Sequence, residues 1–173
     1  LAVCLVDPRR QRHLALPGLH VRPRLDNGDT TSLLDEARAA GVIAATPSNN
    51  IVNFFDPAAV RWWWQHAVLP KVREGARFLK TDEGSVYPDE RLHNLFPVVY
   101  AKAAYEGFQT ELGRRGFNLT REGYAGVQRY PYIWAGDWPS RWTFFAPVMR
   151  GGLSISLSGI GAWGHNAGGF EEV

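Results

Sequence analysis

Short apolar segments alternate with longer helical patterns along most of this chain. Ala76–Thr81 is an apolar run of strand length, and the segment before it begins at Asp56 and Pro57, where aspartate can cap a helix and proline fits the first helical position. Leu92–Arg115 has the pattern of a long amphipathic helix, and Phe117–Arg121 that of a further strand. Strands that alternate with helices pair in parallel through right-handed crossovers. The chain is therefore predicted to form a parallel α/β sheet.

The other segments extend this alternation, and we expect one domain with a loop-rich excursion over residues 7–55. Arg9–Arg24 is predicted to be loop-like because Pro17, Gly18 and Pro23 interrupt it. No low-complexity linker divides the chain. Further strands are expected at Leu1–Val6, Tyr130–Ala135 and Leu153–Leu157, further helices at Thr30–Ala40 and Ser140–Arg150, and the helix that starts at Pro57 is expected to reach about Arg73.

Charge and cysteine content exclude several classes of protein. The chain has 19 Lys and Arg against 17 Asp and Glu, and this small surplus does not indicate nucleic-acid binding. Cys4 is the only cysteine, which excludes an internal disulfide and a cysteine-based zinc site and leaves the compartment undecided. No apolar run approaches the roughly 18 to 20 residues that span a bilayer. We expect neither nucleic acid nor a membrane as partner, and both ends resemble cut ends of a longer chain.

Charged and aromatic residues gather where three predicted strands end. Lys80 and Asp82 end the first, Arg121 ends the second, and Trp134 and Asp137 follow the third. In parallel α/β folds, the carboxyl ends of the strands carry the residues that face a ligand. Several such ends in succession indicate one site. A later glycine-rich segment can turn sharply enough to bring two more side chains over the same pocket, namely His165 and Phe170.

The pairing of two carboxylates is the feature that suggests chemistry. Lys80 and Asp82 lie two residues apart and project from the same face of a strand, and a neighbouring cation favours the ionised carboxylate that a nucleophile needs. A structural ion pair has the same spacing. Asp137 after Gly136, taken alone, is typical of a turn. Together they predict a sugar-cleaving enzyme in which Asp82 is the reactive carboxylate and Asp137 faces it.

Five motifs follow one another in a fixed order over residues 52 to 170. They are Asn53–Pro57 with Trp62–Trp63, Phe78–Asp82, Arg121–Arg129, Trp134–Asp137, and Ser158–Gly159 with His165–Phe170. In this order they resemble glycoside hydrolase family 31. The resemblance implies a (β/α)8 TIM barrel, of which this chain holds roughly the third to the seventh strand. It also implies retaining cleavage of α-linked sugars, with no cofactor and no metal.

The resemblance also implies roles for individual residues. Asp82 matches the family's nucleophile, and Asp137 matches its general acid/base. In such a mechanism the acid protonates the leaving oxygen while the nucleophile forms a covalent glycosyl intermediate, and the two carboxyl groups lie about 5 to 5.5 Å apart. Asp137 must then be protonated at rest, whereas Asp82 stays ionised. The substrate-binding residues implied are Lys80, Arg121, Trp134, His165 and Phe170.

Three departures from the family pattern each remove a carboxylate, and none falls on the two catalytic positions. Ser85 stands three residues after the nucleophile, where the family usually has an acid. Asn166 replaces the aspartate of the glycine-rich motif, and Asn53 replaces the aspartate of the first motif.

Functions other than hydrolysis use the same residues. An isolated section of about five strands leaves open sheet edges, so the chain also fits a non-catalytic carbohydrate-binding barrel or an inactive fragment. A lyase or a transglycosylase would use the same two carboxylates. We expect a hydrolase acting on an α-glucoside or an α-xyloside, with the remainder of the barrel required as a partner. Lys80 before the nucleophile resembles the α-xylosidase-like and bacterial branches of the family.

Overall fold

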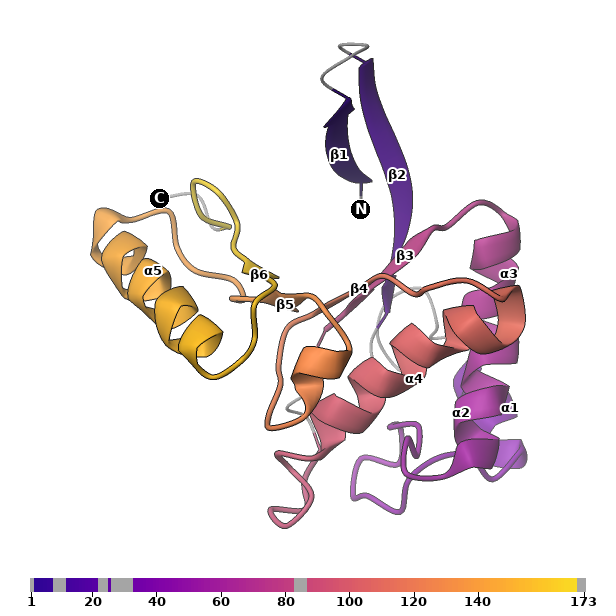
Figure 1. The fold of residues 1–173 in the computed structure, drawn as a ribbon. Helices are drawn as coiled ribbons and strands as arrows, with labels where there is room; N and C mark the ends of the chain where they lie inside the picture. The colour runs from indigo at the N-terminus through magenta and orange to yellow at the C-terminus, as the bar shows by residue number, and fades with distance from the viewer. Residues whose placement is uncertain (1, 8–11, 22–24, 26–32, 83–86, 171–173) are drawn as a thin grey trace.

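One sheet of six strands, ordered along the sheet as along the chain, organises the molecule (Figure 1). The computed structural model describes residues 2–7, 12–21, 25, 33–82 and 87–170. All neighbouring strands pair in parallel except the first two, which form an antiparallel hairpin. Parallel strands in sequential order form the wall of a TIM barrel, so the predicted fold class is confirmed for a part of such a barrel. The strands are β1 (Ala2–Asp7), β2 (Arg12–Val21), β3 (Phe78–Thr81), β4 (Asn118–Thr120), β5 (Ile133–Trp134) and β6 (Trp163–Gly164).

The helices connect the parallel strands, and one of them, α2, begins at a side-chain cap. The Asp56 side chain accepts a hydrogen bond of 2.8 Å from the Ala58 N–H at the start of α2, as predicted. Pro70 lies in the first turn of α3, after a π-helical turn at Trp64–Val68 that changes the helical register. The helices are α1 (Leu34–Ala39), α2 (Pro57–Trp63), α3 (Leu69–Arg73), α4 (Phe96–Leu112), a 3-10 turn at Val127–Arg129, and α5 (Trp142–Leu157).

The main core lies between β3 and the helices α2 to α4, and aromatic rings fill it. Trp63 is fully buried, and Phe54 packs edge-on against it with ring centroids 5.1 Å apart. The Trp64 indole donates a 2.6 Å hydrogen bond to the Ala103 carbonyl of α4, while Trp62 stacks on His66 nearer the surface. Ala76 and Leu79, before and within β3, belong to this core, so the helices pack against the strand that leads to Asp82. No helix in the described part of the chain is long and apolar enough to cross a membrane.

The predicted loop at Arg9–Arg24 is wrong for Arg12–Val21, which forms β2. This strand changes partner along its length. Pro17 pairs opposite Ala2 of β1, whereas Gly18 pairs opposite Phe78 of β3. Pro17 and Gly18 thus lie at the point where β2 stops pairing with β1 and begins to pair with β3. Strands tolerate proline and glycine at such irregular positions. The pattern that suggested a loop marks this change of partner.

The strand predicted at Leu153–Leu157 is also wrong, because these residues form the end of α5. Gly151 and Gly152 do not end the helix, although the sequence suggested a break there. Gly152 lies against the ring of Trp163, so the missing side chain is what allows α5 to pack on β6. The last parallel strand is therefore Trp163–Gly164, further along the chain than expected.

Replacing Gly152 by alanine is expected to destabilise the fold. A Cβ at this position would overlap the Trp163 ring, and such overpacking costs about 1 to 3 kcal/mol. The matched control is Gly151→Ala on the same helix, where an added Cβ meets nothing within 4 Å. Thermal unfolding should show a lower Tm for the first variant and an equal or higher Tm for the second, because alanine favours helix over glycine. A Gly152→Ala variant with the same Tm as wild type would contradict the packing of Gly152 against Trp163.

Candidate active site

Parallel register brings the ends of three strands to one edge of the sheet. Thr81 of β3 pairs with Thr120 of β4, and Thr120 pairs with Ile133 of β5. The residues that directly follow these positions therefore emerge side by side. Asp82 follows β3 and Arg121 follows β4, and the Arg121 N–H also donates to the Thr81 carbonyl at 3.1 Å. The predicted convergence at the strand ends is present.

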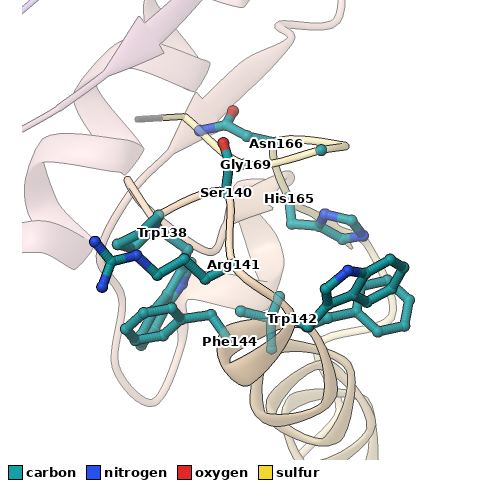
Figure 2. Close-up of a pocket in the computed structure, with 12 residues that line it drawn as sticks. Trp138, Ser140, Arg141, Trp142, Phe144, His165, Asn166 and Gly169 are labelled. Carbon is teal, nitrogen blue, oxygen red and sulfur yellow. The ribbon is translucent and has the colours of Figure 1, made fainter. Parts of the chain in front are cut away.

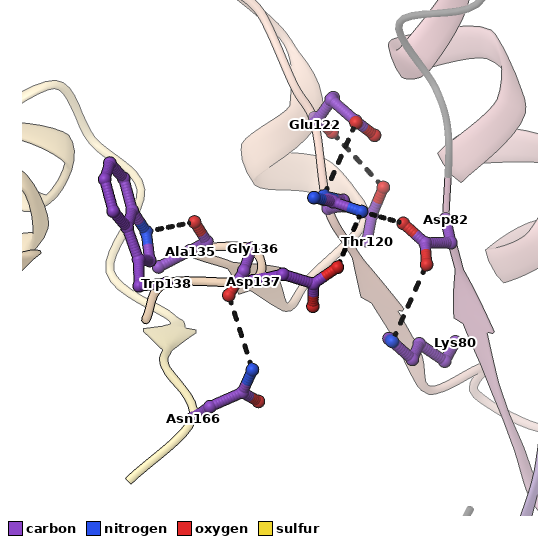
Figure 3. A network of polar contacts seen from close by, with 10 residues as sticks. Lys80, Asp82, Thr120, Glu122, Ala135, Gly136, Asp137, Trp138 and Asn166 are labelled. Carbon is purple, nitrogen blue, oxygen red and sulfur yellow. Dashed lines mark hydrogen bonds and ion pairs between the residues drawn. The ribbon is translucent and has the colours of Figure 1, made fainter. Parts of the chain in front are cut away.

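One guanidinium nitrogen joins the two carboxylates (Figure 3). Arg121 Nη1 lies 3.0 Å from Asp82 Oδ1 and 3.2 Å from Asp137 Oδ2. These two oxygens are therefore at most about 6.2 Å apart, the sum of the two distances. The two carboxylates thus face the same cation.

A second cation contacts Asp82 from within the sheet. Lys80 Nζ lies 3.7 Å from Asp82 Oδ2, and both side chains are buried, with 9% and 6% of their surface exposed. The same nitrogen lies 3.8 Å from the centroid of the Trp134 ring, which gives it a favourable cation–π contact. A buried carboxylate between two cations is stabilised in its ionised form.

Arg121 carries the strongest electrostatic signature of the site. Burial acts to lower its pKa, but the hydrogen bond and the charge of Asp82, together with the charges of Asp137 and Glu122, raise that pKa above its usual value. Glu122 Oε1 lies 3.9 Å from Arg121 Nε, a contact that the sequence interpretation did not anticipate, although Glu122 is the next residue. These neighbouring acids therefore favour the charged form of the guanidinium.

The loop after β5 holds Asp137 through backbone and amide contacts. Gly136 has a φ of +92°, a left-handed conformation that favours glycine, and it turns the chain so that Asp137 faces Arg121. Asn166 accepts a 3.1 Å hydrogen bond from the Trp134 indole and donates a 3.4 Å hydrogen bond to the Gly136 carbonyl. Asp137 Oδ1 is shielded from solvent and has no hydrogen-bond partner among the described residues.

A cavity of about 410 Å³ lies beside this network, between the loop after Asp137, the start of α5 and the loop after β6 (Figure 2). His165 lines it, as do Trp138, Arg141 and Phe144. In Figure 3 the Trp138 side chain points away from the Asp137 carboxylate, while Asn166 belongs both to the polar network and to the lining of the cavity. Phe170 is 59% exposed, and its N–H donates to the Trp138 carbonyl at 2.9 Å.

The predicted site residues thus fall into two groups. Lys80, Asp82, Arg121 and Trp134 form one connected cluster with Asp137, whereas His165 and Phe170 belong to the loop beside the cavity, and their contact with a sugar stays a prediction. Ser85 lies outside the described residues. Asn53 Oδ1 accepts a hydrogen bond from the Phe55 N–H at 3.3 Å, which stabilises the turn before α2. No three His, Cys, Asp or Glu side chains within the described ranges are grouped so that they could hold a metal ion.

Comparison with known proteins shows the family. The model of the glycosyl hydrolases family 31 TIM-barrel domain matches residues 12–173. An α-xylosidase of Emericella nidulans is 33% identical over 134 residues, covering 70% of this chain and 17% of the relative, and an α-glucosidase of Saccharolobus solfataricus is 38% identical over 82 residues, covering 47% and 12%. The chain therefore spans less than a fifth of the length of these relatives.

Solved structures show the same fold. A family 31 sulfoquinovosidase from E. rectale superimposes with a TM-score of 0.76 at 24% identity, over 90% of this chain and 27% of that one. The predicted resemblance is confirmed: the chain belongs to glycosyl hydrolase family 31 and forms part of its TIM-barrel domain.

Proposed function

We propose that this chain carries the catalytic centre of a retaining α-glycoside hydrolase of the α-glucosidase or α-xylosidase type, with Asp82 as nucleophile and Asp137 as general acid/base. The observation that carries the proposal is the pair of carboxylates joined by Arg121, at distances of 3.0 and 3.2 Å from one nitrogen. Relatives named α-xylosidase and α-glucosidase support the substrate class. The substrate is a carbohydrate with a terminal α-linked sugar.

The proposed reaction proceeds in two displacements. Asp82 attacks the anomeric carbon, the glycosidic bond breaks, and Asp137 gives its proton to the departing oxygen. The sugar is then bound to Asp82 as an ester. Water attacks the same carbon, Asp137 takes one of its protons, and Asp82 is released as a carboxylate. The sugar leaves with its original anomeric configuration.

The environments of the two carboxylates support different roles. Asp82 contacts both Lys80 and Arg121 and is almost fully buried, which favours the ionised form that attacks carbon. Asp137 contacts Arg121 through Oδ2 only, and its Oδ1 has no hydrogen-bond partner within the described ranges. Two carboxyl groups in different surroundings are the usual way in which an acid and a nucleophile share one site.

The remainder of the barrel is proposed to complete the pocket. The structure has five parallel strands, β2 to β6, and a closed TIM barrel has eight. Strands and loops beyond these would supply the other walls of the sugar site, so assays belong to the full-length protein that contains this domain.

The stereochemistry of the product tests the proposal. Proton NMR of early time points should show the α-anomer released from an aryl α-glucoside or α-xyloside, before mutarotation obscures it. Release of the β-anomer would overturn the retaining assignment. Calorimetry that detects sugar binding without any hydrolysis would favour a carbohydrate-binding barrel instead.

A further inference from the structure

The Asn166 side chain uses both ends of its amide within the active site. Its Oδ1 accepts from Trp134 Nε1 at 3.1 Å. Its Nδ2 donates to the Gly136 carbonyl at 3.4 Å (Figure 3). The orientation of the amide follows from chemistry, because an indole N–H can only donate and therefore requires the oxygen of the amide opposite it. The nitrogen must then face Gly136.

These two contacts join the two halves of the catalytic cluster. Trp134 lies 3.8 Å beneath Lys80 Nζ and 5.3 Å from the Arg121 guanidinium carbon, the two cations that contact Asp82. Gly136 directly precedes Asp137 and has a left-handed conformation, so the hydrogen bond to its carbonyl constrains the backbone from which the Asp137 side chain extends. The Asn166 side chain, from the loop after β6, therefore links the backbone before Asp137 to the Trp134 ring. That ring in turn contacts Lys80 and Arg121.

We infer that Asn166 is a positioning residue for the general acid/base in this chain, and that it acts through an amide that both donates and accepts. This inference rests on the proposed function. An aspartate at this position would still accept from Trp134, but it has no proton for the Gly136 carbonyl and would place negative charge against that oxygen. Asn166 therefore donates a hydrogen bond to the Gly136 carbonyl, before Asp137, that a carboxylate cannot donate.

The expected signature is a defect in leaving-group protonation. Asn166→Asp should lower kcat/KM about 10- to 100-fold for phenyl α-glycosides and disaccharides, because a displacement of the acid by a fraction of an ångström weakens proton transfer. Glycosyl fluorides depart with little help from an acid, so their hydrolysis should change less than about threefold. The dependence of kcat/KM on leaving-group pKa should become steeper.

The experiment compares wild type, Asn166→Asp and Asn166→Ala in the full-length protein. Asn94→Asp, which adds the same charge at an exposed position, is the control. Rates are expressed per active site, counted by labelling with an activated fluorosugar, so that misfolded protein does not contribute. The alanine variant removes both contacts without adding charge, and it should show the same selective loss.

Two results would overturn the inference. An equal loss for fluorides and phenyl glycosides would mean that Asn166 supports the fold or the nucleophile and does not position the acid. If kcat/KM depended on leaving-group pKa in both variants as it does in wild type, the amide would be dispensable. Neither result affects the proposed function, which fails only if the wild-type protein does not hydrolyse α-glycosides with retention.

Discussion

Asp82→Asn is expected to reduce kcat by on the order of 10⁴-fold or more, because an amide is a poor nucleophile and no neighbouring group can replace the covalent step. An activated fluorosugar should label wild-type protein on the peptide that contains Asp82, as detected by mass spectrometry, and should leave the variant unlabelled. This effect is larger than any other expected from a single substitution in the site.

The control for this experiment is Asp35→Asn, which removes an equal charge from a side chain that is 95% exposed. Its activity should match that of wild type. Because Asp82→Asn also removes the charge beside the buried Lys80, its Tm is measured alongside, so that loss of activity is separated from loss of fold. A protein that hydrolyses α-glycosides while Asp82 stays unlabelled would refute the assignment of the nucleophile.

Asp137→Ala is expected to lower kcat/KM by about 10² to 10⁴-fold for substrates with poor leaving groups, and far less for glycosyl fluorides. Azide should restore turnover of an activated substrate, since it needs no general base to attack the glycosyl intermediate. The product should be the α-glycosyl azide, because two displacements at one carbon retain configuration. Product NMR distinguishes the two anomers.

The same reagent tests the division of roles between the carboxylates. Asp82→Ala with azide should yield the β-glycosyl azide, because azide then acts directly on the substrate in a single displacement. A β-azide from Asp137→Ala, or an α-azide from Asp82→Ala, would exchange the assignments proposed here.

The fold class and the convergence of the strand-end side chains were both predictable from the sequence. Asp82, Arg121 and Asp137 each follow a strand, and parallel pairing brings such positions together whatever the connecting segments do. The identity of β2 was not predictable in this way, because Pro17 and Gly18 are usually signs of a loop and only the change of strand partner explains them.

Tertiary contacts explain the other differences. Leu153–Leu157 is helical because Gly152 allows α5 to pack against Trp163, a residue of the following strand. Asn166 stood out in the sequence only as a missing carboxylate, since its partners Trp134 and Gly136 lie about 30 residues earlier in the chain. Local patterns do not contain pairings of this kind.

The position of Arg121 has a consequence for what the site can recognise. A nitrogen at 3.0 and 3.2 Å from two carboxylates shows that the gap between them accommodates one cationic centre. In the reaction proposed above, the transition state resembles an oxocarbenium ion, whose positive charge would develop on the sugar ring between Asp82 and Asp137. A ring that reacts there must share the gap with the guanidinium or displace it, and a sugar analogue with a basic ring nitrogen would compete with the protein's own arginine for the same pair of anions.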